Sequence, residues 1–432
     1  MKTLILVFSF NFLLSQILQG QNSNINVVAY DINVKISKSS ETVDIVLLCK
    51  LSVNNPTGRL QFIFSSDAVL HAVKLLKNKD WINVPFEFTG KDSLLLTTGN
   101  SLARDNMYSF KFDYSFPTGL LNDTLLYLDR GHRWYPLIMD QIAPFKLTCE
   151  VPKGYSVLSA GDLLEIDSTR DKSVFIWESS LPVFKLPLIL FTPGTIKKIS
   201  DGKIDLYYSS INSANAKMII TKANEIVTYY NNVGVFPYNK LTMFEIKDFP
   251  GVNTCSGLLM IGTQSLEAIA HGDEDIIILT IAQQWFGSGV FARFGEKGFF
   301  FLSLSLPHYL RLMFIRQEQG EEVFQKSLLD PLTGYKEFAG TENDIPIIDV
   351  DLPNSREKGL ILYAKAPFVL SKIEKELGRD KWLLFIRNLY HSFHGKILSF
   401  EEFSKSLAKY DANGDVLTLL NKLMTGKGMP IE

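Results

Sequence analysis

The chain has 432 residues, of which 46% are hydrophobic and 21% are charged. This length suffices for two or three domains with large cores, and the composition is that of a globular protein. The formal charge of −2 gives no electrostatic case for nucleic-acid binding, which normally needs a clustered basic surface.

The N-terminus predicts a secretory signal peptide over residues 1–20. Lys2 precedes an apolar run from Leu4 to Leu14, and a small residue, Gly20, marks a suitable cleavage site. The alternative is a retained membrane anchor, but the apolar run is short of the roughly 20 residues that a membrane-spanning helix needs. We therefore expect a secreted or periplasmic protein with no transmembrane segment in the mature chain.

The first half of the mature chain has the pattern of β-strands. Ile32, Val34 and Ile36 alternate with polar residues, and the aromatic residues between Tyr108 and Phe116 do the same. Many short strands with few helical patterns indicate antiparallel sheets. The other strand-like runs are 43–53, 60–64, 94–97, 146–151, 174–178 and 187–192.

After about residue 200 the pattern becomes helical, interrupted by a strand predicted over 239–247. Acidic residues at 273–275 precede the apolar run Ile276–Phe286, which predicts a buried helix with carboxylates at its N-terminus. A capping box formed by Ser399 and Glu402 marks the start of another helix. Helices are also predicted at 316–328, 356–377, 379–392 and 400–410.

The cysteines and two clusters of polar residues predict structural roles rather than chemistry. Cys49 and Cys149 lie in strand-like runs and are expected in the core, and with Cys255 the odd count leaves at least one free thiol. His391 and His394 lack accompanying metal ligands, so a solvated or capping role is expected. The Asp411–Asp415 segment departs from a calcium loop and predicts a turn between helices.

The segment Leu279–Gly287 reads Leu-Thr-Ile-Ala-Gln-Gln-Trp-Phe-Gly and resembles the zinc helix of the aminopeptidase N family, H-E-x-x-H-Q-W-F-G. These enzymes are zinc metallopeptidases of the gluzincin clan. Other segments resemble the family in the same order along the chain. They are His132–Pro136, Pro144–Thr148, Pro152–Tyr155, Phe249–Leu258, Tyr363–Ala366 and Gly426–Pro430.

The resemblance implies an α+β fold. A saddle-like antiparallel β-domain is expected over residues 22–197. A thermolysin-like, mainly helical peptidase domain is expected over residues 198–432.

The departures from the family pattern fall on the residues that hold the metal. The resemblance places Leu279 and Gln283 where the family has zinc-binding histidines, and Lys297 where it has a zinc-binding glutamate. Leucine has no lone pair, glutamine is a poor zinc ligand, and an ammonium group repels a dication. No zinc and no other cofactor is therefore expected. Lys297 is expected either to pair with a carboxylate in place of the metal charge or to point into solvent.

The other family positions are changed as well. The resemblance places Thr280 at the general-base glutamate and Thr254 at the glutamate that binds the free amine of the substrate. Only Tyr363, at the family's transition-state tyrosine, is retained, and a packing role is the alternative for it. The candidate cleft residues are Thr254, Thr280, Gln283, Lys297 and Tyr363.

We therefore expect an exported pseudoenzyme, a catalytically inactive homologue of zinc aminopeptidases that binds a peptide or protein in the cleft between its domains. One alternative is an active metallo-aminopeptidase with a displaced or non-standard site. A second alternative is a purely structural subunit. The identity of the ligand and the oligomeric state stay open.

Overall fold

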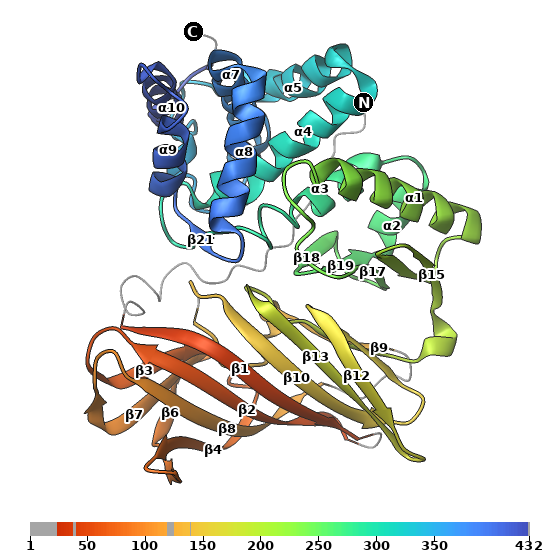
Figure 1. The fold of residues 1–432 in the computed structure, drawn as a ribbon, viewed down its shortest axis with the longest axis vertical. Coiled ribbons are helices and arrows are strands. Elements are labelled where there is room, and N and C mark those ends of the chain that lie inside the picture. Colours follow the sequence, from red (N-terminus) through yellow and green to blue (C-terminus); the bar gives the residue numbers. More distant parts are fainter. Residues whose placement is uncertain (1–23, 38–39, 119–124, 139, 431–432) are drawn as a thin grey trace. The chain divides into compact units, whose positions relative to one another are not determined.

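The computed structural model describes residues 24–37, 40–118, 125–138 and 140–430 (Figure 1). The predicted signal peptide lies outside these residues. The chain divides into two compact units. The first comprises the chain up to Lys198 with Tyr207–Ser209 and Tyr238–Ile261, and the second comprises Ile199–Leu206, Ser210–Pro237 and the chain from Gly262. The domain boundaries expected from the sequence stay predictions.

The first unit contains an eight-stranded sheet in the order β12-β13-β10-β1-β2-β8-β4-β5. The predicted alternation is confirmed, because Ile32, Val34 and Ile36 are all buried. Neighbouring strands are antiparallel, as expected, with the exception of β1 and β10, which run parallel. The strands are β1 (Ile25–Ile36), β2 (Thr42–Val53), β4 (Val69–Lys77), β5 (Asp80–Asn83), β8 (Met107–Pro117), β10 (Ala143–Pro152), β12 (Asp162–Ser168) and β13 (Lys172–Val183).

Two three-stranded sheets complete the core of this unit, in the orders β3-β7-β6 and β11-β14-β9. The Phe62 ring of β3 packs edge-on against Phe112 of β8, with ring centroids 5.6 Å apart. Cys49, Cys149 and Cys255 are all buried free thiols, which confirms the core role expected for the first two. The strands are β3 (Thr57–Ile63), β6 (Phe86–Gly90), β7 (Ser93–Leu102), β9 (Leu125–Leu128), β11 (Ser156–Ser159) and β14 (Leu188–Phe191).

A five-stranded sheet follows in the order β15-β16-β17-β19-β18, so that β18 is an edge strand. The predicted strand at 239–247 is β17, whose residues are all buried. The strands are β15 (Lys197–Asp201), β16 (Ile204–Tyr208), β17 (Leu241–Ile246), β18 (Val252–Cys255) and β19 (Leu258–Gly262).

The second unit is mainly helical (Figure 1). Two π-helical turns, η3 (Phe301–Ser305) and η5 (Ile361–Lys365), precede α4 and α7. None of the helices in the described part of the chain is long and apolar enough to cross a membrane. The helices are α1 (Ser213–Tyr230), α2 (Thr263–Ala270), α3 (Glu274–Ala282), α4 (Leu306–Gln319), α5 (Glu321–Lys336), α6 (Arg356–Leu360), α7 (Ala366–Leu377), α8 (Arg379–Phe393), α9 (Phe400–Ala408) and α10 (Asp415–Thr425).

The helix predicted at 316–328 is wrong, because the chain changes direction inside it. Gly320 adopts φ +88°, a conformation that ends α4 and lets α5 begin at Glu321. The capping box of α9 is confirmed, with reciprocal bonds between Ser399 and Glu402.

The predicted turn before α10 is confirmed. The two carboxylate oxygens of Asp411 accept hydrogen bonds from the N–H groups of Gly414 (3.1 Å) and Leu417 (2.8 Å). The Asp411 side chain therefore caps the helix instead of facing an ion. His394 directly follows α8 at its C-cap position, where its backbone N–H donates to the Tyr390 carbonyl (2.7 Å), while the solvated or capping role expected for its side chain stays a prediction.

Candidate functional site

Helix α3 carries three of the residues singled out from the sequence. Every side chain from Ile276 to Ala282 is buried, as expected for a helix that is apolar on all sides. The N–H of Gln283 donates to the carbonyl of Leu279 (3.1 Å), so these two residues lie one helical turn apart. Both side chains are less than a tenth exposed.

The helix ends earlier than the predicted Phe286. Beyond Ala282 the backbone tightens, with the N–H groups of Gln284 and Trp285 bonded to the carbonyls of Ile281 and Ala282. The Trp285 indole then donates a hydrogen bond to the carbonyl of Gly234 (2.7 Å). It also packs against the Tyr230 ring, with ring centroids 5.2 Å apart. Trp285, part of the most specific motif in the sequence, is therefore an anchor of the core.

Thr280 directs its hydroxyl back into its own helix. The Oγ1 atom donates to the carbonyl of Ile276 (2.9 Å) and also lies 3.2 Å from that of Ile277. A threonine hydroxyl has one proton and no basicity near neutral pH, and this one is buried. The residue thus packs the helix and has no group that can activate water.

Lys297 lies in the turn that follows α3 and β20 (Phe291–Ala292), and its side chain is 75% exposed. Its ammonium forms an ion pair with Asp349 (2.7 Å). Lys297 therefore points into solvent, as one of the two expectations has it, and its ion pair lies at the surface, so a pairing that replaces the metal charge stays a prediction. Gln283 is enclosed in the core, whereas the Lys297 side chain extends into solvent.

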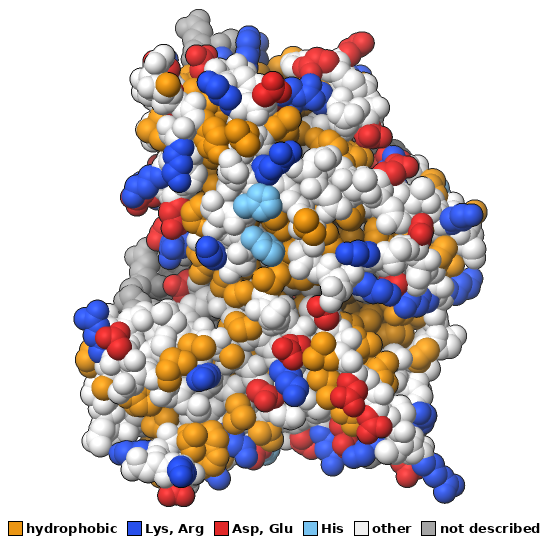
Figure 2. Space-filling view, in the orientation of Figure 1, with side chains coloured by type: hydrophobic (Ala, Val, Ile, Leu, Met, Phe, Trp, Pro, Cys, Tyr) orange, Lys and Arg blue, Asp and Glu red, His pale blue; other side chains and the backbone are white. Residues whose placement is uncertain are grey.

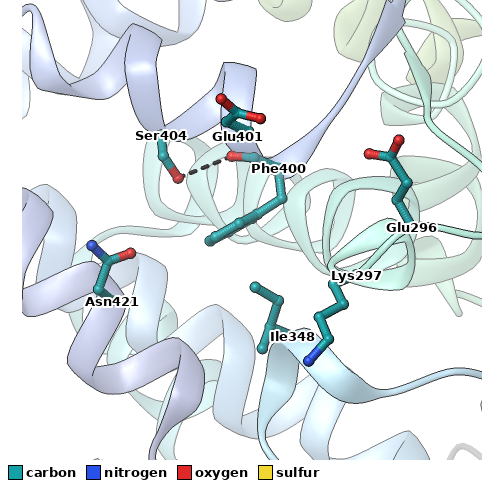
Figure 3. Close-up of a pocket in the computed structure, with 7 residues that line it drawn as sticks. All are labelled: Glu296, Lys297, Ile348, Phe400, Glu401, Ser404 and Asn421. Carbon is teal, nitrogen blue, oxygen red and sulfur yellow. Dashed lines mark hydrogen bonds between the residues drawn. The ribbon is translucent and has the colours of Figure 1, made fainter.

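Lys297 also lines an open groove of about 440 Å³ within the second unit (Figure 3). Phe400 and Ile348 form its apolar part, and the Ser404 hydroxyl donates to the Phe400 carbonyl (2.9 Å). Glu296, Glu401 and Asn421 complete its lining. No sequence pattern predicts this groove, because its walls come from segments that are far apart in the chain.

Tyr363 lies in the π-helical turn η5 and is half-buried, and the burial of its hydroxyl group raises the pKa of its phenol. Its ring meets the His308 imidazole edge-on, with centroids 5.3 Å apart. The neighbouring turn η3 contacts η5 directly, where Ser305 donates its hydroxyl to the Leu362 carbonyl (2.8 Å). Wide turns of this kind leave carbonyls without their usual helical partner, and Ser305 supplies one here.

His308 was isolated in sequence, and only the fold brings it against Tyr363. Its Nδ1 atom is enclosed, and no group among the described residues hydrogen-bonds to it. Burial, and secondarily the nearby charge of Arg311, lower the pKa of the imidazole well below its usual value of 6.5. The guanidinium of Arg311 itself pairs with Asp275 at the start of α3 (2.6 Å).

Replacing His308 with glutamine is expected to flatten the loss of stability in acid. Below pH 6.5 the unfolded chain binds a proton that the folded imidazole does not, so the free energy of unfolding falls as the pH falls. From pH 6.5 to 5 this contribution reaches about 2 kcal/mol at most. Urea unfolding at pH 7 and 5 measures it, with His71→Gln at an exposed position as the control. If the free energy of unfolding fell equally from pH 7 to pH 5 in wild type and in His308→Gln, the assignment of this loss to His308 would be contradicted.

Thr254 lies in the first unit, on the edge strand β18, and its carbonyl accepts a hydrogen bond from the Lys185 ammonium (3.2 Å). The same ammonium donates to the side-chain oxygen of Asn253 (2.6 Å), whose amide donates to Asp129 (3.0 Å). Burial lowers the pKa of Lys185 below its usual value. No sequence pattern singles out Lys185, because its partners are distant along the chain.

No family model and no curated protein sequence matches the chain. Solved structures do. One is an M1 zinc metallopeptidase mutant from Deinococcus radiodurans bound to a Tyr-Ser-Ala substrate, with a TM-score of 0.76 and 15% identity, covering 94% of this chain and 96% of that chain. A two-domain M1 zinc metallopeptidase mutant bound to L-arginine has a TM-score of 0.76 and 14% identity, and the match covers 94% of this chain and 95% of that chain. The M1 zinc metallopeptidase from Deinococcus radiodurans has a TM-score of 0.73 and 14% identity, and the match covers 94% of this chain and 95% of that chain.

The chain has the fold of a two-domain M1 zinc metallopeptidase.

The family pattern places the ligands of a zinc ion at Leu279, Gln283 and Lys297, and these three side chains do not fit one. Leu279 offers only hydrocarbon, Gln283 only a neutral amide, and the ammonium of Lys297 is bonded to Asp349. Within the described ranges no group of three or more His, Cys, Asp or Glu side chains is arranged to hold a metal. Thr254, Thr280, Gln283, Lys297 and Tyr363 stay predictions as cleft residues.

Proposed function

We propose that this protein is an exported, catalytically inactive relative of zinc aminopeptidases that binds a peptide or protein. The observation that carries the proposal is which residues occupy α3 and its C-terminal end. At the two positions one helical turn apart, where the family pattern has histidines, this helix has Leu279 and Gln283. Because zinc needs deprotonated donors in tetrahedral array, the change removes the ion and with it the activated water.

Thr280 supports the same proposal independently of the metal. Its hydroxyl is bonded to the carbonyl of Ile276 and is enclosed in the helix. A hydrolase without zinc would need another general base within reach of a water molecule. Thr280 does not supply one.

An extended peptide is the ligand class that the proposal favours. Edge strands bind peptides by adding a strand to the sheet, and β18 is the edge strand of its sheet. One solved structure with this fold holds a Tyr-Ser-Ala substrate. The predicted signal peptide adds export to the proposal, since a binding protein outside the cytoplasm would meet such peptides.

Purified protein is expected to contain no stoichiometric zinc and to leave aminoacyl anilides intact. Elemental analysis and an anilide-cleavage assay measure both, with and without chelator. The M1 zinc metallopeptidase from Deinococcus radiodurans serves as the active control. One zinc per chain together with turnover that the chelator abolishes would establish the active alternative instead.

Amide hydrogen exchange tests the binding half of the proposal separately. Added peptides are expected to slow exchange in Val252–Cys255 of β18, because the new strand pairs with this edge. Exchange that is unchanged by any peptide would favour the purely structural subunit.

A further inference from the structure

The eight-stranded sheet of the first unit ends in two edge strands, β12 and β5. Figure 1 draws β12 at one end of this sheet and β4, the partner of β5, toward the other. An edge strand presents unpaired N–H and C=O groups on its outer side, which can hydrogen-bond to a strand of another chain.

Both edges also expose large apolar side chains. On β12, Leu163, Leu164 and Ile166 are 41 to 59% exposed. On the opposite edge, Trp81 and Ile82 of β5 are 38 and 43% exposed. Single exposed apolar residues are ordinary, but groups of them on unpaired strands mark interaction surfaces.

The two edges differ in charge. Strand β12 carries Asp162, Glu165 and Asp167, and acidic and apolar side chains lie together in the part of Figure 2 where Figure 1 draws β12. The hairpin that joins β4 to β5 carries Lys77 and Lys79, both exposed, beside a single acid, Asp80. Charged residues on sheet edges normally prevent pairing between copies. Here like edges repel each other, whereas unlike edges attract.

We propose that β12 of one copy of this chain pairs with β5 of a second copy, edge to edge and head to tail. The partner is a second copy because each edge finds the complementary charge and apolar surface on the same chain. The contact is heterologous, so each pair leaves one β12 and one β5 free and further copies add until a ring closes or a filament grows. This inference does not depend on the proposed peptide binding.

Analytical ultracentrifugation of the purified full chain over a range of concentrations tests the proposal. The wild-type chain is expected to form species larger than the monomer as its concentration rises. Its self-association is expected to weaken with added salt, because salt screens the charges. Ile166→Lys on β12 and Ile82→Glu on β5 each replace an exposed apolar side chain with a charge opposite in sign to that of its own edge, and are expected to weaken association at least about tenfold. Leu384→Lys, at a helix residue 46% exposed, is the matched control and should associate as wild type. Circular dichroism confirms that each variant is folded.

Mixing the two edge variants gives the decisive result. Ile166→Lys keeps β5 intact and Ile82→Glu keeps β12 intact, so an equimolar mixture is expected to form a heterodimer that neither variant forms alone. A monomeric wild type would overturn the proposal. So would variants that associate like wild type, or a mixture that stays monomeric, since the last result would mean that the edges serve a different partner or a symmetric contact.

Discussion

Replacing Lys365 with methionine is expected to lower the free energy of unfolding by about 3–5 kcal/mol. The side chains of Lys365 and Asp344 are 1% and 0% exposed, and the ammonium lies 3.2 Å from the carboxylate. The ammonium also donates to the Gly426 carbonyl (2.9 Å) and lies 5.1 Å from the Tyr335 ring centroid. Methionine fills a similar volume but leaves the Asp344 charge buried without its cation, which is the costly outcome.

The same network ties the end of the chain to the helices. The second carboxylate oxygen of Asp344 accepts hydrogen bonds from the N–H groups of Gly340 (2.8 Å) and Gly428. The Tyr335 hydroxyl donates to the Gly428 carbonyl (2.8 Å). Loss of Lys365 is therefore expected to loosen the segment from Gly426 onward as well as α5 and η5.

Urea unfolding of wild type and Lys365→Met measures the effect. Lys358→Met is the matched control, because Lys358 pairs with Asp351, whose side chain is 77% exposed, and such a pair is worth at most about 1 kcal/mol. Adding Asp344→Asn to Lys365→Met should recover part of the loss, since it removes the uncompensated charge. Equal losses for Lys365→Met and Lys358→Met would show that the buried pair has no special weight.

Gly234→Ala is expected to destabilise the second unit by about 3 kcal/mol. A Cβ atom at Gly234 would lie 2.1 and 2.2 Å from two carbons of the Tyr390 ring. The ring is held there by its hydroxyl, which donates to the Val235 carbonyl (2.9 Å). The backbone is held as well, since Trp285 donates to the Gly234 carbonyl (2.7 Å). Neither the Tyr390 ring nor the Gly234 backbone can move aside without breaking a hydrogen bond, of which the one from Trp285 is buried.

Thermal and urea unfolding, followed by tryptophan fluorescence, measure the change. Gly359→Ala in α6 is the control, because a Cβ atom there meets nothing within 4 Å. That substitution should be neutral or stabilise by up to about 1 kcal/mol through helix propensity. Adding Tyr390→Leu to Gly234→Ala should relieve part of the overlap, and a Gly234→Ala variant as stable as wild type would refute the close packing.

Most helices and strands could be predicted from local sequence patterns, with two exceptions that depend on the rest of the chain or on a single glycine. Alternation predicted β1 and β8, and helical patterns predicted α8 and α9, because these periods depend only on which face is buried. The parallel pairing of β1 with β10 was missed, since strand partners are chosen by contacts remote in sequence. The break at Gly320 was also missed, although a glycine beside acidic residues is a signal of one helix ending and another beginning.

The candidate site divides in the same way. Leu279 and Gln283 were expected one helical turn apart, and α3 confirms this spacing. The meeting of His308 with Tyr363, and that of Lys365 with Asp344, could not be predicted, because each joins segments that only packing brings together.

What the sequence by itself determined is the chemistry available to α3. Whether a side chain can donate a lone pair to a metal is a property of that side chain alone, so Leu279 excludes itself in any surroundings. Only the tertiary structure decided which groups are buried, paired or exposed. Lys297 bonds to Asp349 in solvent while Lys365 is enclosed with Asp344, and the two lysines differ only in what the folded chain packs around them.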